Sequence, residues 1–136
     1  MGVTYAVGNI MTEKIICLDR SARVADAMRL MVDKEIGSVL VTQGTEMIGI
    51  VTERDVLKRL CEDPQGSEAS IGDVMSNPLI TIDWNAAIGL AADKMSEKRI
   101  RRLLVTENKK IRGIVTERDL MRATIDVFKK LSDAWI

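Results

Sequence analysis

Two identical stretches of seven residues carry the polar side chains best suited to binding chemistry in this sequence. Gly49–Asp55 reads Gly-Ile-Val-Thr-Glu-Arg-Asp and recurs unchanged as Gly113–Asp119. A threonine at a helix start presents its hydroxyl beside unpaired backbone N–H groups, and such a helix start attracts phosphate. An aspartate one helical turn later points the same way and can accept hydrogen bonds from a ribose diol. Each stretch therefore offers suitable groups for a phosphate and a ribose diol.

The same residues also have a purely structural explanation. Thr-x-x-Asp resembles an ordinary capping box, in which the acid favours the helix N-terminus. For one isolated motif, capping is the commoner role. Here both copies keep every intervening residue while their surroundings have diverged, which favours a function beyond capping. The glycine that opens each stretch permits close approach of a ligand or of another backbone segment, and both possibilities stay open.

The two stretches occupy equivalent places in an internal duplication. Residues 7–62 align with residues 71–126 without a gap, and the polar segment 62–70, with Pro64 and Gly66, is the expected linker. Residues 127–136 have no counterpart and are expected to continue the last helix. We expect one module over residues 1–136.

Each copy is expected to fold as β-α-β-β-α. In copy one, the run Lys14–Leu18 predicts a strand, and apolar residues at helical spacing follow it. Ser21, and Asn85 in copy two, are the expected N-caps of these helices. The remaining expected features are the doubly covered strands Val39–Val41 and Leu103–Val105, the turns Gln43–Glu46 and Glu107–Lys110, third strands ending at Val51 and Val115, and helices beginning at Thr52 and Thr116.

The repeated motif resembles the hallmark of the CBS-domain family. That hallmark is a glycine, two apolar residues, a threonine or serine, two variable residues and an aspartate, and this sequence carries it twice in tandem. The resemblance runs from Val7 to Asp126. It implies an α+β (mixed α/β) fold in which two pseudo-symmetric β-α-β-β-α repeats pack sheet to sheet. It also implies two clefts between the repeats for adenosine-containing ligands such as AMP, ADP, ATP or S-adenosylmethionine.

In that family, the threonine and aspartate of one repeat contact phosphate and ribose, while the first strand of the other repeat brackets the adenine. The implied first cleft consists of Thr52, Arg54, Asp55, Leu79, Ile80, Thr81, Arg101 and Arg102. The implied second cleft consists of Thr116, Arg118, Asp119, Ile15, Ile16, Cys17, Gly37 and Ser38.

These two clefts are expected to differ in charge. Arg101 and Arg102 stand where copy one has Gly37 and Ser38. Arginine binds phosphate through two parallel hydrogen bonds, which glycine and serine cannot match. Adjacent strand residues point to opposite faces, so only one arginine should face the cleft, and by analogy with the family it is Arg102. The hypothesis is that the first cleft prefers a phosphorylated ligand and that the second takes a less charged one or stays empty.

Composition excludes several other function classes. Among 136 residues, 20 basic and 20 acidic side chains cancel, there are few aromatic residues and there is no histidine. A general nucleic-acid binder is therefore not expected. The cysteines Cys17 and Cys61 are expected to be buried, and without histidine they make no convincing zinc site or Cys–His pair. We expect no enzyme activity, no metal and no required cofactor. No apolar run approaches a membrane span and no signal peptide is recognisable, so we expect a cytoplasmic protein.

The resulting prediction is a regulatory module that senses an adenine nucleotide, and the alternative is a structural dimerisation module without a physiological ligand. Family members commonly pair through their helices, so a homodimer is expected, together with an unidentified enzyme or transporter that reads the signal. Met28, Met31 and Met95 suit either a dimer surface or the core. The apolar stripe of the tail suits either an extra turn that covers the domain edge, which we favour, or a dimer contact; it comprises Val127, Phe128, Leu131 and Trp135.

Overall fold

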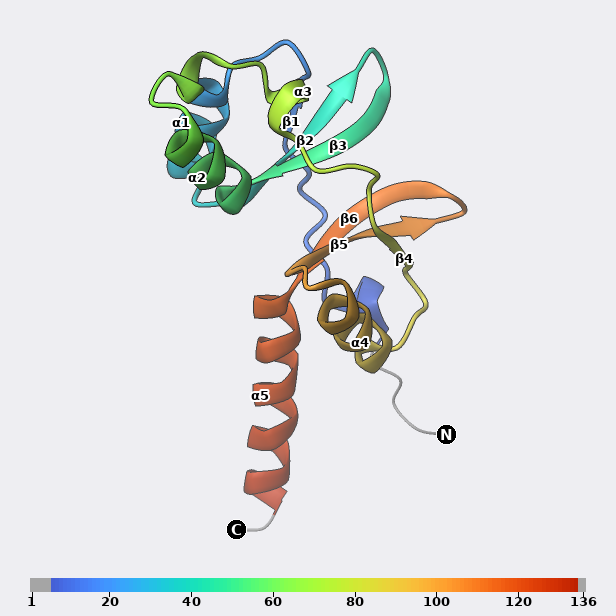
Figure 1. Ribbon diagram of the computed structural model, residues 1–136. Helices are drawn as coiled ribbons and strands as arrows, with labels where there is room; N and C mark the ends of the chain where they lie inside the picture. Colours follow the sequence, from blue (N-terminus) through green and yellow to red (C-terminus); the bar gives the residue numbers. More distant parts are fainter. Residues whose placement is uncertain (1–5, 135–136) are drawn as a thin grey trace. The chain divides into compact units, whose positions relative to one another are not determined.

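The computed structural model describes residues 6–134, and two compact units make up the chain. One unit, the Asp55 unit, spans Ile15–Leu79. The other, the Asp119 unit, combines the residues up to Lys14 with those from Ile80 onward. Each unit contains a three-stranded sheet and flanking helices, which confirms the predicted mixed α+β class (Figure 1).

The Asp55 unit has the expected β-α-β-β-α order with two short additions. Parallel pairing joins β1 to β2, antiparallel pairing joins β2 to β3, and the sheet order is β1-β2-β3. The short helices after α2 were not predicted, because segments of three or four residues show no helical periodicity. Its elements are β1 (Cys17–Asp19), α1 (Val24–Lys34), β2 (Ser38–Gln43), β3 (Glu46–Thr52), α2 (Glu53–Glu62), a 3-10 turn (Gly66–Glu68) and α3 (Ile71–Val74).

The Asp119 unit repeats this topology with the sheet order β4-β5-β6. Its hairpin turn places Asn108 and Lys109 at φ values of 52° and 66°, whereas the equivalent turn in the other unit uses Gly44 at 62°. Glycine and asparagine tolerate this left-handed conformation best, which explains why both predicted turns form. Its elements are a 3-10 turn (Val7–Asn9), β4 (Thr81–Asp83), α4 (Ile88–Lys98), β5 (Arg102–Glu107), β6 (Lys110–Thr116) and α5 (Glu117–Ala134).

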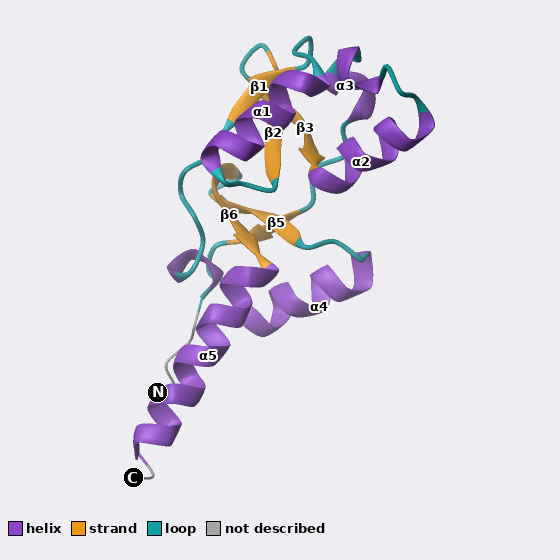
Figure 2. Cartoon of the chain, turned by 90° about the vertical axis from the view of Figure 1, so that its left-hand side faces the viewer, coloured by secondary structure: helices purple, strands orange, loops and turns teal. Residues whose placement is uncertain are grey.

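The central strands of both sheets are buried along their whole apolar runs, as predicted. Val39, Leu40 and Val41 are 1%, 3% and 0% exposed. Val39 and Val41 join the cluster formed with the helices of their unit, which cover one face of the sheet (Figure 2). Leu40 points to the other face, because side chains alternate along a strand, and it is buried there too.

The segment that begins each sequence copy packs into the unit of the other copy. Ile71 is fully buried in the apolar cluster of the Asp55 unit, and Val7 is fully buried in that of the Asp119 unit. Paired backbone hydrogen bonds hold both segments: Ile71 N–H donates to the Ala22 carbonyl and Val7 N–H to the Ala86 carbonyl, each at 2.8 Å. The boundaries of the sequence copies and of the compact units therefore differ by one short segment.

The predicted N-caps Ser21 and Asn85 are wrong. Ser21 donates its backbone N–H and its hydroxyl to the Asp19 carboxylate, and these hydrogen bonds lower the pKa of Asp19. Asn85 likewise donates its backbone N–H to Asp83 at 3.0 Å. An aspartate two residues earlier thus fixes a turn first. The caps are Arg23 and Ala87, and both helices begin later.

The first strand begins later than predicted: β1 spans Cys17–Asp19, so it shares Cys17 and Leu18 with the predicted run Lys14–Leu18 and ends one residue beyond it. Both cysteines are exposed, which corrects the expectation that they are buried. The cause is local: Cys17 lies in a strand whose first and last residues are exposed, and Cys61 lies in the last turn of α2 on its exposed side. Flanking apolar residues do not report on the face that a residue occupies.

The burial of apolar side chains decides between the roles expected for the methionines and for the tail. Met31 and Met95 are 7% and 4% exposed and belong to the cores, so packing explains them. The tail does continue the last helix, and α5 runs on from β6 to Ala134 (Figure 1). However, Phe128 and Leu131 are 65% and 52% exposed, so the favoured covering role is wrong for them. Trp135 lies outside the described residues.

Candidate functional site

Thr52 and Asp55 cap helix α2 reciprocally. The backbone N–H and the hydroxyl of Thr52 donate to Oδ2 of Asp55, at 2.8 and 3.0 Å, and the Asp55 N–H donates to the Thr52 hydroxyl at 3.2 Å. This is the capping box that the sequence allowed. The cap engages one carboxylate oxygen, Oδ2, and leaves the other outside it.

Thr116 and Asp119 repeat this geometry at the start of α5. Oδ2 of Asp119 accepts from the Thr116 N–H at 2.9 Å and from its hydroxyl at 3.1 Å. The Asp119 N–H donates to the Thr116 hydroxyl at 3.3 Å. Both aspartates are half-buried, whereas Arg54 and Arg118 in the same helical turns are exposed. The two identical motifs therefore produce the same local structure.

The two aspartates differ at their second oxygen. Oδ1 of Asp55 accepts a hydrogen bond from the hydroxyl of Ser76 at 3.0 Å. Thr12 is the residue equivalent to Ser76 in the duplication, and its side chain donates no hydrogen bond to Asp119 within the described chain. Sequence reasoning missed Ser76, because it lies 21 residues from Asp55 and only the exchange of segments brings it there.

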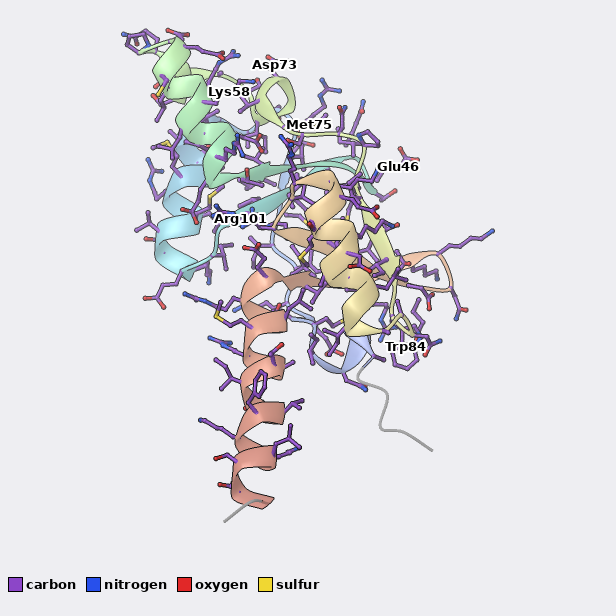
Figure 3. The ribbon with its side chains drawn as sticks, turned by 60° about the horizontal axis from the view of Figure 1, so that its bottom comes forward. Glu46, Lys58, Asp73, Met75, Trp84 and Arg101 are labelled. Carbon is purple, nitrogen blue, oxygen red and sulfur yellow. The ribbon has the colours of Figure 1, made fainter. Side chains whose placement is uncertain are left out.

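The glycine of each motif leaves room for the backbone of a neighbouring segment. A Cβ atom at Gly49 would lie 2.5 Å from the Met75 sulfur and 3.0 Å from the Ser76 carbonyl oxygen, both in the segment after α3 (Met75 is labelled in Figure 3). Ile50 and Ser76 exchange two backbone hydrogen bonds beside it, at 3.0 and 2.8 Å. Of the two roles left open for this glycine, close approach of a backbone segment is the one observed.

In the Asp119 unit the same arrangement recurs. A Cβ atom at Gly113 would lie 2.7 Å from both the Met11 sulfur and the Thr12 carbonyl oxygen. Thr12 and Ile114 exchange two backbone hydrogen bonds, each at 2.9 Å. The exchanged segment therefore runs directly past the motif in both units, and its residues become candidates for the sites.

Strand pairing places the residues before β2 beside the threonine of the same copy. Ser38 pairs with Thr52 across the β2–β3 ladder. The Gly37 carbonyl accepts the first backbone N–H of helix α2, from Glu53, at 3.1 Å. Gly37, Ser38, Thr52 and Asp55 thus lie together in one unit.

The corresponding arginines lie beside Thr116. Arg102 pairs with Thr116, and the Arg101 carbonyl accepts the Glu117 N–H at 2.9 Å. The Arg101 side chain is 80% exposed and forms only a 3.9 Å contact with Glu117, which a surface position makes weak (Arg101 is labelled in Figure 3). Arg102 is half-buried, in keeping with the alternation expected for adjacent strand residues.

The predicted residue sets each draw on both units. Of the first set, the Asp55 unit holds Thr52, Arg54, Asp55 and Leu79, and the Asp119 unit holds Ile80, Thr81, Arg101 and Arg102. Of the second set, the Asp119 unit holds Thr116, Arg118 and Asp119, and the Asp55 unit holds Ile15, Ile16, Cys17, Gly37 and Ser38. Contacts inside a unit do not test these combinations, which stay predictions.

Two further properties of the first strands concern chemistry. Although Cys17 is exposed as a residue, the partial desolvation of its thiol raises the pKa of that thiol above its usual value, so the neutral thiol is favoured. In the other unit Lys94 donates to the Thr81 carbonyl, where copy one has an apolar Leu30. Lys94 was not singled out from the sequence, although a lysine on the apolar side of α4 was a visible departure from the repeat.

Residues 6–134 contain neither a candidate metal site nor a helix suited to span a membrane. These residues include no group of three or more His, Cys, Asp or Glu side chains placed to hold a metal ion. Among their helices, none combines the length and apolar character that a membrane span needs.

Comparison with known proteins gives a family and a set of similar folds. The chain is 32% identical over 126 residues to an uncharacterized 33.4 kDa protein encoded in a ribosomal RNA operon of Thermofilum pendens, covering 85% of this chain. It spans 42%, 32% and 62% of the length of that protein and of two further uncharacterized relatives, from Methanocaldococcus jannaschii and Methanopyrus kandleri.

Solved structures of similar fold include an uncharacterized conserved protein from Pyrococcus horikoshii, with a TM-score of 0.84 and 30% identity over 91% of this chain and 95% of that one. Another is a CBS-domain pair solved in complex with 5′-methylthioadenosine and S-adenosyl-L-methionine, with a TM-score of 0.79 and 23% identity over 89% of this chain and 96% of that one. The family model described as "CBS domain" matches residues 7–62 and again residues 71–126. With both sequence copies matched, the chain belongs to the CBS-domain family.

Proposed function

We propose that this chain is a regulatory module that binds an adenosine-containing ligand, with AMP, ADP, ATP and S-adenosylmethionine as the candidates. One observation carries the proposal: the cap in each unit engages Oδ2 of the aspartate and leaves Oδ1 for other donors. Capping alone explains the threonine and half of the carboxylate. A ribose hydroxyl is a suitable donor for the remaining oxygen.

The surroundings of the carboxylates suit such a ligand. Each lies in the first turn of a helix, where backbone N–H groups and the helix dipole favour phosphate. The known CBS-domain pair of similar fold, solved with two adenosine derivatives, adds support at the level of the ligand class. The proposal includes the two residue sets predicted from the sequence, with Arg102 as the phosphate-binding arginine of the Asp55 site.

A thermal-shift titration with AMP, ATP and S-adenosylmethionine tests the proposal. A ligand that binds only the folded chain stabilises it by about 2.7 kcal/mol at a hundred times its dissociation constant. We expect at least one of the three to raise the melting temperature. Asp55→Asn and Asp119→Asn should each reduce the shift, and the double variant should abolish it. No shift with any ligand contradicts the proposal.

The second candidate function is a dimerisation module without a physiological ligand. The exposed apolar side chains of α5 favour it, because an exposed apolar patch of this kind often marks an interaction site. Dimerisation by itself is compatible with ligand binding, so the ligand titration, and not the oligomeric state, separates the two candidates. We propose a homodimer, an unidentified enzyme or transporter as the regulated protein, no catalysis by the chain itself, and the cytoplasm as its location.

A further inference from the structure

Ser76 is held beside Asp55 by its backbone. It exchanges two backbone hydrogen bonds with Ile50, at 2.8 and 3.0 Å, and the residue before it packs on Gly49. The hydroxyl therefore reaches Oδ1 of Asp55, at 3.0 Å, with rotation about a single side-chain bond as its main freedom. Ser76 is exposed as a residue and Asp55 is half-buried, so the pair lies at the surface of its unit.

The hydroxyl group determines what the pair can still bind. A serine hydroxyl has one donor and two acceptor lone pairs, and a carboxylate oxygen has two acceptor sites. With its proton directed to Asp55, Ser76 Oγ keeps its acceptor capacity, and Oδ1 keeps one acceptor site. Two acceptor atoms thus lie 3.0 Å apart. Neighbouring hydroxyl groups of a cis-diol have a similar separation, so each hydroxyl can donate to one acceptor.

The other unit lacks this arrangement. Thr12 has the same backbone bridge, to Ile114, yet its side chain donates no hydrogen bond to Asp119 within the described residues. Its hydroxyl is therefore not fixed beside the carboxylate in the way that Ser76 is. The two identical motifs acquire different surroundings from the exchanged segments.

We propose that Ser76 and Asp55 together bind the two ribose hydroxyls of an adenosine ligand, and that Ser76 makes this site selective for ribose over its deoxy forms. This inference rests on the proposed function and adds a specificity-determining residue to it. Ser76 accepts from one hydroxyl while it orients Oδ1 toward the other. The Asp119 site, without a serine in this role, discriminates less between these sugars.

Calorimetric titration in an Asp119→Asn background tests this, because that background leaves the Asp55 site as the site measured. The probes are AMP, 2′-deoxy-AMP and 3′-deoxy-AMP. We expect the parent to bind at least one deoxy form roughly tenfold more weakly than AMP. Ser76→Ala should weaken AMP binding by a similar factor. This variant should then bind that deoxy form almost as well as it binds AMP, since the contact between Ser76 and the ribose hydroxyl is already gone.

Thr12→Ala is the matched control and should change neither affinity nor discrimination in this background. The melting temperature of each variant without ligand confirms that it is folded, and Ser76→Thr, which keeps a hydroxyl, should retain part of the discrimination. Unchanged or tighter AMP binding by Ser76→Ala overturns the inference. So does a Ser76→Ala variant that still binds the deoxy form as much more weakly than AMP as the parent does. In both cases the parent still binds AMP and the proposed function stands. Failure of the parent to bind AMP contradicts the inference and the AMP assignment together.

Discussion

The backbone N–H of Ile71 donates to the carbonyl oxygen of Ala22 at 2.8 Å, so the first residue of sequence copy two is fixed in the core built by copy one. Val7 and Ala86 form the same bond in the other unit. Each core thus requires an apolar residue that its own sequence copy does not supply. The duplication cannot be divided at the linker without removing both residues.

We expect Ile71→Ala to destabilise the chain by about 2–5 kcal/mol, because it removes a fully buried side chain and leaves a cavity. Leu90→Ala is a comparable truncation in α4, where the side chain is 55% exposed, and it should cost less than about 0.5 kcal/mol. Urea unfolding followed by circular dichroism measures both. Equal effects of the two substitutions would contradict the exchange of segments.

The motif glycines give a second stability prediction. Gly113→Ala places a Cβ atom 2.7 Å from the Thr12 carbonyl oxygen, and that backbone is itself bonded to Ile114. We expect a loss of about 1–3 kcal/mol, as for other overpacked sites. Gly89 in α4 has no heavy atom within 4 Å of such a Cβ, so Gly89→Ala should stabilise the chain by roughly 0.5–1 kcal/mol. Thermal unfolding of the two variants should therefore shift in opposite directions.

Sequence reasoning predicted most of the fold because the repeat doubles each local signal. The runs around Leu40 and Leu104 are buried strands as predicted, and the hairpin turns form at the predicted ranges Gln43–Glu46 and Glu107–Lys110. The helix starts after Ser21 and Asn85 were wrong, because an aspartate two residues earlier captured the local hydrogen bonds. Such competition between two nearby polar residues is decided by geometry that a sequence pattern does not contain.

For the candidate sites too, the sequence predicted the local features and missed a contact between distant segments. Thr52, Asp55 and their equivalents have the predicted local geometry, because one helical turn fixes it. Ser76 was not found, since its approach to Asp55 depends on a contact between segments that are distant in sequence. The partners expected from the opposite copy remain a prediction of the family resemblance.

Arg102 gives a prediction about those partners. Within its unit it pairs with Thr116, whereas the resemblance assigns it to the site of Asp55. We expect Arg102→Ala to weaken AMP binding about tenfold or more and to leave adenosine binding unchanged, because guanidinium–phosphate hydrogen bonds are charge-assisted.

A pair of double variants decides which site Arg102 serves. Its effect should disappear in an Asp55→Asn background and persist in an Asp119→Asn background, as measured by calorimetry. The reverse pattern would assign Arg102 to the site of Thr116, beside which the strand pairing places it. Equal AMP affinity with and without Arg102 in both backgrounds would reject its phosphate role.

Cys17 gives a prediction about pH. Desolvation penalises the thiolate and raises the pKa of Cys17 above that of an ordinary thiol. In a Cys61→Ser variant, alkylation by iodoacetamide should therefore reach its half-maximal rate at a higher pH for the folded chain than for the same chain in urea. Because the folded state favours the neutral thiol, the contribution of Cys17 to stability is present below the pKa that Cys17 has in the unfolded chain. This contribution is lost as the pH rises from that value through the higher pKa of the folded chain. Coincident pH profiles in the two conditions would contradict the shift.

The exposed stripe of α5 gives a prediction about association. Met121, Ile125, Phe128 and Leu131 recur at helical spacing and are 64%, 45%, 65% and 52% exposed. We expect a second copy of the chain to cover this stripe, so that light scattering at micromolar concentration gives the mass of a dimer. Phe128→Glu should convert it to a monomer, because a carboxylate in an apolar interface loses its hydration without gaining a partner.

Lys130→Glu is the matched control for this substitution. Lys130 is exposed about half a turn around the helix from Phe128, as a spacing of two residues requires. A charge change there should leave the dimer intact, because it lies away from the stripe. A monomeric wild-type chain would reject the homodimer, and a dimer that survives Phe128→Glu would place its interface elsewhere on the chain. Loss of the dimer in both variants would point to net charge as the cause, since each substitution makes the chain more acidic.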